Sequence, residues 1–263
     1  AIAEDLPTFD VTSEWLFSGD DYATAKLLAK EAGILCGIHV FKTVFKYLDS
    51  SVEVMVLKED GAVVNPGACI ATVTGLTQSI LMAERTALNL LQRMSGIATE
   101  TSRYVAATAG TSATIVDTRK TAPGLRVLDK MAVKVGGGNN HRFNLSDGVL
   151  IKDNHIAAAG GIKAAVDSVR KHIPHTLKIE VEVDSIRGLV EAIESGADIV
   201  MLDNMSIDDM IEAVDVNAGR TILEASGNMT LDRIQAVAKT GVQLISVGAL
   251  THSVKALDFS LKF

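Results

Sequence analysis

The sequence has 263 residues, which is enough for one large domain or for a barrel with a smaller companion domain. Its 48% hydrophobic and 22% charged residues are ordinary for a globular protein and exclude a disordered or fibrous chain. The net charge of −7 disfavours nucleic acid as a partner, because binding to a phosphate backbone usually needs a basic surface.

The sequence shows no targeting or membrane signal. No stretch approaches the roughly 18 uninterrupted apolar residues of a membrane helix, and the acidic start AIAEDLPTFD is unlike a signal peptide. The two cysteines, Cys36 and Cys69, lack the spacing of a zinc site or of a disulfide framework. We therefore expect a cytoplasmic protein that binds neither membranes nor nucleic acid.

The first part of the chain is expected to form a small α+β domain. Asp-Gly and Pro-Gly pairs within 59–70 predict a compact hairpin-rich turn. A helical pattern then extends from Ser79 to about Ala107, with an expected break at Ser95–Gly96. The other predicted elements are three strands, at 24–30, 52–58 and 69–75, and one helix at 40–48.

The second part alternates short apolar runs with amphipathic helical patterns, which is typical of repeated βα units and a parallel sheet. The predicted strands, rich in Val, Ile and Leu, are 113–118, 148–151, 177–183, 198–203, 221–225 and 243–247. The predicted helices are 162–172, 186–195, 207–216 and 231–240. Because a full barrel has eight strands, we expect an incomplete α/β barrel, with its active site at the C-terminal strand ends.

A cation-rich segment interrupts this acidic chain. From Asp117 to His155, seven Lys and Arg residues stand against four Asp, so the segment carries +3. Such a concentration indicates an anionic small-molecule ligand, with a solvated charged face as the alternative. The string DTRKTAPGLR (117–126) begins at a strand end and supplies Arg119, Lys120 and Arg126, and arginine can hold a carboxylate or phosphate with two hydrogen bonds.

A glycine-rich string, KVGGGNNHR (134–142), precedes the second strand of the barrel. Its three glycines permit close approach of the backbone to a ligand, or they simply end the preceding helix. His141 is accordingly either a ligand-binding or a structural histidine. Arg142 adds a further cation.

Charged and small residues follow the later strands. Lys152 suits Schiff-base chemistry or phosphate binding, and Glu182 and Asp203 suit ribose hydroxyls, Mg2+ or structural ion pairs. The strings ASGN (225–228) and SVGALTHS (246–253) offer backbone amides to a phosphate, or they form ordinary turns.

Taken together, these strings resemble the quinolinate phosphoribosyltransferase family over nearly the whole chain. The combination of DTRKTxPGxR with GGGxNHR is highly specific. Asn228 departs from the family pattern, which often has glycine there. The other similar strings include ERTALNLLQRMSGIAT (84–99), IKDNH, EVEVDS, MLDN, ASGN and VGALTHS.

The resemblance implies an N-terminal open-faced α+β sandwich domain (1–94), to which 255–263 return, and an incomplete parallel α/β barrel (95–254). It implies transfer of phosphoribosyl from phosphoribosyl pyrophosphate to quinolinate with decarboxylation, a step of NAD biosynthesis. The products are nicotinate mononucleotide, pyrophosphate and CO2. The resemblance further implies Mg2+ as cofactor and a homodimer with a shared active site, or a higher oligomer.

The resemblance also assigns roles to single residues. The catalytic residues are Lys120, Lys152, Glu182 and Asp203, of which Glu182 and Asp203 meet the ribose and Mg2+, directly or through water. The pyridine dicarboxylate is surrounded by Arg119, His141 and Arg142, and Arg85 reaches into the partner's site. The 5′-phosphate is held by Ser226, Gly227, Asn228, Gly248, Ala249 and His252.

Three alternatives remain from the residues alone. A related phosphoribosyltransferase would use a monocarboxylate or another heterocycle. Loss of one clamp arginine would favour it, but Arg85, Arg119, Arg126 and Arg142 are all present. A Schiff-base aldolase would use Lys152 as its nucleophile, but it would not need so many other cations. A non-catalytic binding protein would have no use for charged residues at successive strand ends.

Overall fold

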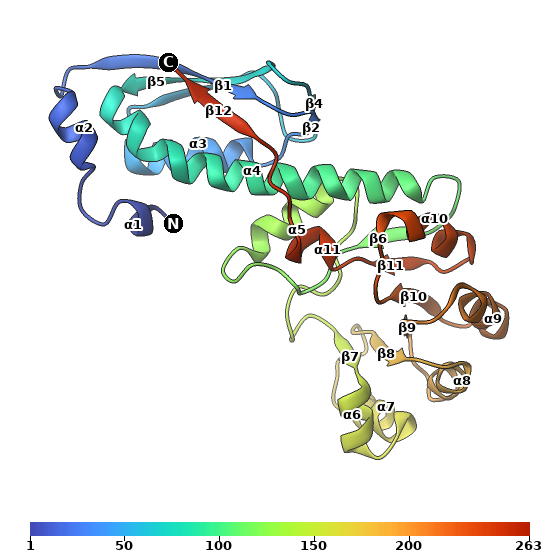
Figure 1. Cartoon of the computed structure of the whole chain (residues 1–263). Helices are drawn as coiled ribbons and strands as arrows, with labels where there is room; N and C mark the ends of the chain where they lie inside the picture. The colour runs from blue at the N-terminus through green and yellow to red at the C-terminus, as the bar shows by residue number, and fades with distance from the viewer. The chain divides into compact units, whose positions relative to one another are not determined.

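The computed structural model describes residues 1–263, which form two compact units (Figure 1). The first unit comprises Ala1–Ser102, Val127–Gly136 and Val254–Phe263, and the second comprises Arg103–Arg126 and Gly137–Ser253. No feature of the sequence indicated that Val127–Gly136 belong with the first unit. The domain boundary between residues 94 and 95 stays a prediction.

The first unit contains a four-stranded antiparallel sheet with the strand order β12-β1-β5-β3. Buried and exposed residues alternate along β1, so the sheet has one covered and one open face. Helices α3 and α4 lie along the covered face (Figure 1), and their apolar side chains form one core with those of the sheet. The elements are α1 (Ile2–Asp5), α2 (Val11–Leu16), β1 (Tyr22–Ala29), β2 (Gly33–Ile34), α3 (Ile38–Leu48), β3 (Glu53–Val56), β4 (Val63–Val64), β5 (Cys69–Leu76), α4 (Thr77–Ala107) and β12 (Phe259–Lys262).

Helix α4 is continuous, so the expected break at Ser95–Gly96 was wrong. The Ser95 hydroxyl accepts a hydrogen bond from the Cys36 amide at 2.9 Å and donates to the Cys36 carbonyl at 3.0 Å. A Cβ on Gly96 would lie 2.1 Å from the carbonyl oxygen of Lys255. Both residues therefore serve contacts with other segments of the first unit. Neither this helix nor any other is long and apolar enough to cross a bilayer.

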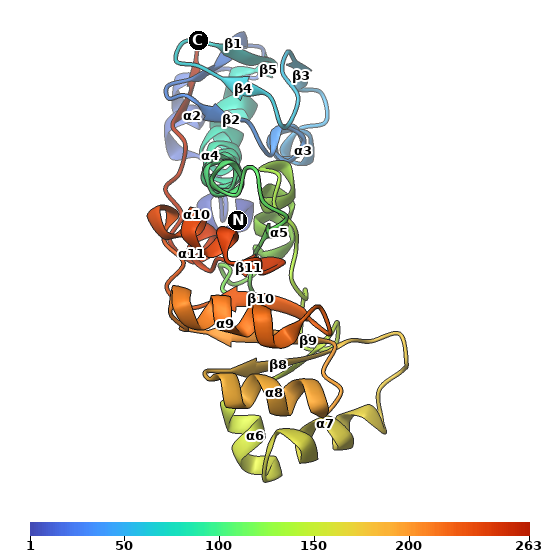
Figure 2. The same ribbon diagram turned by 90° about the vertical axis from the view of Figure 1, so that its right-hand side faces the viewer.

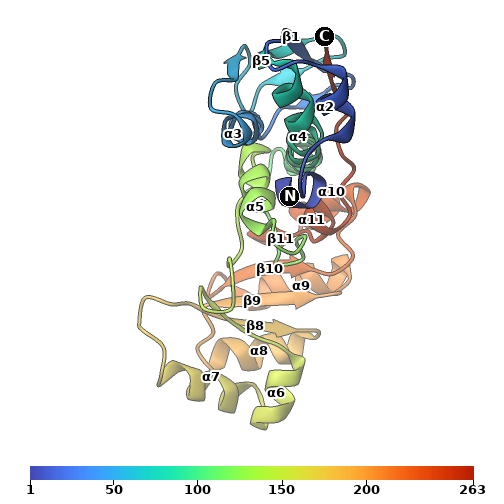
Figure 3. The same ribbon diagram turned by 90° about the vertical axis from the view of Figure 1, so that its left-hand side faces the viewer.

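The second unit is built on a six-stranded parallel sheet with the order β6-β11-β10-β9-β8-β7. The edge strands β6 and β7 do not pair with each other, which confirms the incomplete barrel. The predicted strands and helices are also confirmed; α8 and α9 lie along one side of the sheet (Figures 2 and 3). The elements are β6 (Thr114–Val116), β7 (Val149–Ile151), α6 (Asp153–Ala159), α7 (Ile162–Arg170), β8 (Ile179–Val183), α8 (Ile186–Glu194), β9 (Ile199–Asp203), α9 (Ile207–Asn217), β10 (Ile222–Ser226), α10 (Leu231–Lys239), β11 (Leu244–Ser246) and α11 (Ala249–His252). Helix α5 (Arg126–Val135) follows β6 in the sequence but belongs, from Val127 on, to the first unit.

The register of the parallel strands decides which side chains share a face. Glu182 is level with Met201, and Met201 is level with Glu224 on the next strand. Two residues further along strands β9 and β10, Asp203 is level with Ser226. Because side chains alternate along a strand, these polar groups point to the same side of the sheet near its C-terminal edge.

We expect Gly96→Ala to lower the free energy of unfolding by about 1–3 kcal/mol, because the added Cβ cannot fit against the Lys255 backbone. Urea denaturation measures this loss. Gly19→Ala is the matched control, since nothing lies within 4 Å of a Cβ placed there. Equal stability of the two variants would contradict the close approach seen at Gly96.

Candidate active site

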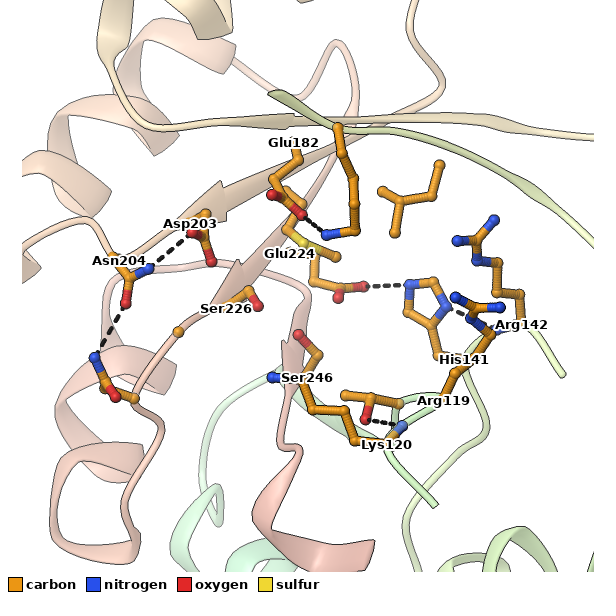
Figure 4. A pocket seen from close by; sticks show the side chains of 16 residues that line it. Arg119, Lys120, His141, Arg142, Glu182, Asp203, Asn204, Glu224, Ser226 and Ser246 are labelled. Atoms are coloured by element: carbon orange, nitrogen blue, oxygen red, sulfur yellow. Dashed lines mark hydrogen bonds and ion pairs between the residues drawn. The ribbon is translucent and has the colours of Figure 1, made fainter. Parts of the chain in front are cut away.

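A pocket of about 490 Å3 lies at the C-terminal ends of the parallel strands in the second unit (Figure 4). Its lining contains ten of the residues that the sequence singled out: Arg119, Lys120, His141, Arg142, Lys152, Glu182, Asp203, Ser226, Gly227 and Asn228. It also contains Thr118, Leu150, Met201, Asn204, Glu224 and Ser246. The strand ends thus bring together charged groups that are far apart in the sequence.

Cationic side chains from two loops form one wall of this pocket (Figure 4). Arg119 and Lys120 follow β6, and Arg142 belongs to the loop before β7. Burial, and then the positive charge of Arg119, lower the pKa of Arg142. Two guanidinium groups that repel each other in a partly buried site favour the binding of an anion between them.

Buried polar contacts hold these two loops in place. The carboxylate of Asp117, which has no exposed surface, accepts a hydrogen bond from the His141 amide at 2.9 Å. Arg126 donates to the Phe143 carbonyl at 3.2 Å and to the Thr121 hydroxyl at 3.1 Å. The Arg126 guanidinium therefore ties the loops together and does not line the pocket, so its interpretation as a cation for the ligand stays a prediction.

The glycines at 136–138 do not line the pocket either. A Cβ on Gly136 would lie 2.5 Å from the Ala98 carbonyl oxygen, so this glycine allows close packing against α4. Gly137, the second residue after the end of α5, has φ +91°. Of the two readings of this string, the structure supports helix termination and packing.

The opposite wall of the pocket carries carboxylates (Figure 4). Glu182, at the end of β8, forms an ion pair with Lys152, which follows β7. The last residue of β9, Asp203, accepts a hydrogen bond at 2.8 Å from the side-chain amide of Asn204. Asn204 in turn accepts one from the side-chain amide of Asn228 at 3.2 Å. These contacts order both carboxylates at the rim.

The turn after β10 explains the departure from the family pattern at Asn228. Gly227 has φ +86°, and a Cβ there would lie 2.2 Å from the side-chain oxygen of Asn204. Asn228 has φ +47°, a left-handed conformation that asparagine tolerates better than most residues. The asparagine therefore preserves the backbone that a second glycine would give.

Four residues predicted for the site do not line the pocket: Arg85, Gly248, Ala249 and His252. A Cβ on Gly248 would lie 3.1 Å from both the Lys120 and the His252 side chains. This corner therefore packs against the stem of Lys120. Arg85 is an exposed residue of α4 in the first unit.

Sequence reasoning missed two buried glutamates that contact His141. The His141 Nε2 atom lies 2.9 Å from Glu180 and 3.6 Å from Glu224, and these glutamates are only 4% and 1% exposed. Burial, and then the negative charge of Glu180, raise the pKa of Glu224 to about 8. The sequence does contain a sign of these residues, because Glu180 and Glu224 are acidic residues within the apolar strands IEVEV and ILEAS.

The fold and the pocket define a parallel α/β protein with a cation-lined and carboxylate-lined site at the strand ends. Residues 10–95 match the N-terminal domain of quinolinate phosphoribosyl transferase, and residues 97–262 match the C-terminal domain. The chain therefore belongs to the quinolinate phosphoribosyltransferase family.

Named relatives cover the chain almost from end to end. A probable nicotinate-nucleotide pyrophosphorylase (carboxylating) of Bacillus subtilis is 45% identical, covering 98% of this chain and 89% of the relative. The chloroplastic nicotinate-nucleotide pyrophosphorylase (carboxylating) of Arabidopsis thaliana is 44% identical, and the match covers 100% of this chain and 80% of the relative. The structure of the nicotinate-nucleotide pyrophosphorylase from Francisella tularensis matches with a TM-score of 0.94 and 44% identity. This match covers 99% of this chain and 92% of the other. Since a tobacco relative is mitochondrial, a cytoplasmic location for this chain stays a prediction.

We expect Glu224 to make stability depend on pH. Its folded pKa of about 8 lies above the ordinary 4.5, so between these values the folded protein binds more protons than the unfolded chain. The contribution of Glu224 is therefore full below about pH 4.5 and is lost as the pH rises through about 8. Urea denaturation across this range should show a decline that Glu224→Gln weakens. Identical pH dependence in both proteins would contradict this assignment.

Proposed function

We propose that this protein catalyses the transfer of phosphoribosyl from phosphoribosyl pyrophosphate to quinolinate, with decarboxylation to nicotinate mononucleotide. Pyrophosphate and CO2 are the other products, and the reaction serves NAD biosynthesis. The observation that carries the proposal is a single pocket with a cationic wall facing a carboxylate wall at the strand ends. The names of the full-length relatives support the same reaction.

Charge complementarity assigns the cationic wall to the anionic substrates. Quinolinate carries two carboxylates, and Arg119 and Arg142 can each bind a carboxylate with two parallel hydrogen bonds. The turn at Gly227 and Asn228 is available to the 5′-phosphate. Lys120 lies at the pocket edge beside Gly248, where its charge can reach the pyrophosphate.

Bond cleavage at the ribose uses both walls. As the bond to pyrophosphate breaks, positive charge develops on the sugar and negative charge develops on the leaving group. Glu182 and Asp203 then face the cationic sugar, and Lys120 and Lys152 stabilise the departing anion. Holding the ring nitrogen of quinolinate against the sugar carbon supplies the remaining rate enhancement by proximity.

Glu182 and Asp203 also fit a Mg2+ ion. Both donors are carboxylate oxygens, and Mg2+ binds through one or two carboxylates together with waters and substrate phosphates. Since Glu182 is already paired with Lys152, contact of Glu182 with the ion through water fits better than direct coordination. When bound, the ion neutralises charge on the pyrophosphate.

Decarboxylation is proposed to follow ribosyl transfer. Ribosylation makes the ring nitrogen cationic. When the neighbouring carboxylate leaves as CO2, the electron pair of the broken C–C bond stays on the ring carbon, where the cationic nitrogen stabilises it. A proton from water then adds to this carbon and completes nicotinate mononucleotide. The ion pair of Lys152 with Glu182 argues against a Schiff-base aldolase, because a nucleophilic lysine must be uncharged.

We expect the purified protein to form nicotinate mononucleotide and CO2 from quinolinate, phosphoribosyl pyrophosphate and Mg2+, and to lose this activity in EDTA. Lys120→Ala should lower kcat/KM by at least about 100-fold, since a charge at the leaving group is lost. Lys163→Ala, an exposed lysine on α7, is the control. Ribosylation of nicotinate in place of quinolinate would overturn the substrate assignment, and no product from any pyridine would overturn the reaction.

The active form is proposed to be a homodimer in which Arg85 completes the site of the partner. Two observations support this proposal: Arg85 is exposed, and α2 leaves Val11 and Trp15 on one side of the helix with 63% and 82% of their surface exposed. Leu16 is also 68% exposed. Exposed apolar side chains of this size are typical of surfaces that bind a partner.

Mixing two inactive variants tests the shared site. Arg85→Ala and Lys120→Ala should each be nearly inactive alone. After denaturation and refolding together, about a quarter of the sites should be intact, because half of the dimers are mixed and each has one complete site. Each variant refolded alone is the control. If the mixture has no more activity than its components, Arg85 does not act in the partner's site.

A further inference from the structure

A buried cluster of three side chains lies beside the pocket and has no place in the mechanism above. His141 comes from the loop before β7, Glu180 from the interior of β8 and Glu224 from β10. Their nearest ring and carboxylate atoms all lie within 4.8 Å of one another. In each glutamate one buried carboxylate oxygen, Oε1, has no hydrogen-bond partner. Burial of such groups is costly, so their retention needs a reason beyond packing.

The hydrogen bonds of His141 define its tautomer. The backbone amide of Arg142 donates to Nδ1 at 2.7 Å, so Nδ1 must be the acceptor nitrogen. The ring hydrogen is then on Nε2, which donates to Glu180 across 2.9 Å. Both ring nitrogens therefore have protein partners. In this arrangement His141 can contact a substrate without exchanging a proton with it.

The cluster also separates two cavities. His141, Arg142 and Glu224 line the substrate pocket, and they line a second cavity of about 680 Å3 as well. The second cavity includes Val116 of β6 and Val149 of β7, the two edge strands that do not pair. The imidazole ring thus lies between the pocket and the open side of the sheet.

The charge state of the cluster matters for an anionic substrate. If both glutamates were ionised, two negative charges would lie directly beside a site for carboxylates. Burial and the charge of Glu180 raise the pKa of Glu224 to about 8, which keeps a proton on this residue. Glu180 lies close enough to Arg142 for its carboxylate to raise the pKa of the guanidinium.

On the basis of the proposed function, we propose that Glu180 and Glu224 are positioning residues for quinolinate. Glu180 accepts the Nε2 hydrogen of His141, and the protonated carboxyl of Glu224 fills the space beside it. Together they hold a neutral imidazole as a fixed wall next to Arg142. The dicarboxylate then meets a preorganised surface that carries no second negative charge.

Nitrogen NMR of histidine-labelled, ligand-free protein tests the tautomer independently of catalysis. The signal of His141, assigned by its loss in His141→Asn, should show a hydrogen on Nε2 alone. This tautomer should persist in Glu224→Gln, whose amide is neutral like the protonated acid, and in Glu180→Gln the Nε2 signal should shift, because a neutral amide oxygen replaces the carboxylate acceptor. A hydrogen on Nδ1, or on both nitrogens, would overturn the proposal. So would a stoichiometric metal ion in the purified protein that Glu224→Gln removes.

Steady-state kinetics tests the positioning. Glu180→Gln should raise KM for quinolinate by about tenfold, the scale of one charge-assisted hydrogen bond, and leave KM for phosphoribosyl pyrophosphate unchanged. Glu224→Gln should also raise the KM for quinolinate, but this rise should be several-fold smaller than the rise in Glu180→Gln. In a His141→Asn background, Glu180→Gln should add little. The control is Glu212→Gln, at an exposed site on α9.

Two kinetic results would contradict the positioning role: equal effects of the two Gln variants, or parallel rises of both KM values in Glu180→Gln. A failure of the proposed function would look different from both of these kinetic results. In that case the wild type forms no product, whereas the nitrogen NMR pattern still decides whether the carboxyl pair fixes His141.

Discussion

Repulsion between like charges at the strand ends is the constraint on which the second unit depends. Arg119 and Arg142 are close enough for the charge of one to disfavour the charge of the other. The protein holds them there with uncharged or remote groups: the Gly148 carbonyl accepts from Arg142 at 2.9 Å, and buried Asp117 anchors the loop. An anionic ligand relieves this repulsion. Ligand binding is therefore expected to stabilise the folded unit as well as to start the reaction.

The parallel sheet provides the second half of this arrangement. Since the strands share one direction, their C-terminal ends meet, and residues that directly follow them converge on one pocket. Lys152 with Glu182, and Asp203 with Asn204, form a rim in which each charged group has a partner. The separation of a cationic wall from a carboxylate wall suits a reaction in which an anion leaves a sugar that becomes positive.

Much of this arrangement follows from local patterns in the sequence. Short Val-, Ile- and Leu-rich runs define the strands, and a residue that directly follows a strand, such as Lys152, must lie at the rim. Contacts between distant segments leave no such local signal. Gly96 looks like a helix break until the Lys255 carbonyl is placed beside it, and the hydrogen bond from Arg126 to the Phe143 carbonyl is not visible in the sequence. Glu224 lies within an apolar strand, and its carboxyl meets His141, Glu180 and Ser246, which come from other segments of the chain.

A structure of the protein with quinolinate and an unreactive analogue of phosphoribosyl pyrophosphate tests the role of the two walls. We expect the pyridine carboxylates against Arg119 and Arg142, with the His141 ring unmoved beside them. The ribose should lie toward Glu182 and Asp203. Binding of quinolinate outside this pocket, or with its carboxylates toward the carboxylate wall, would show that the cationic wall does not bind this substrate.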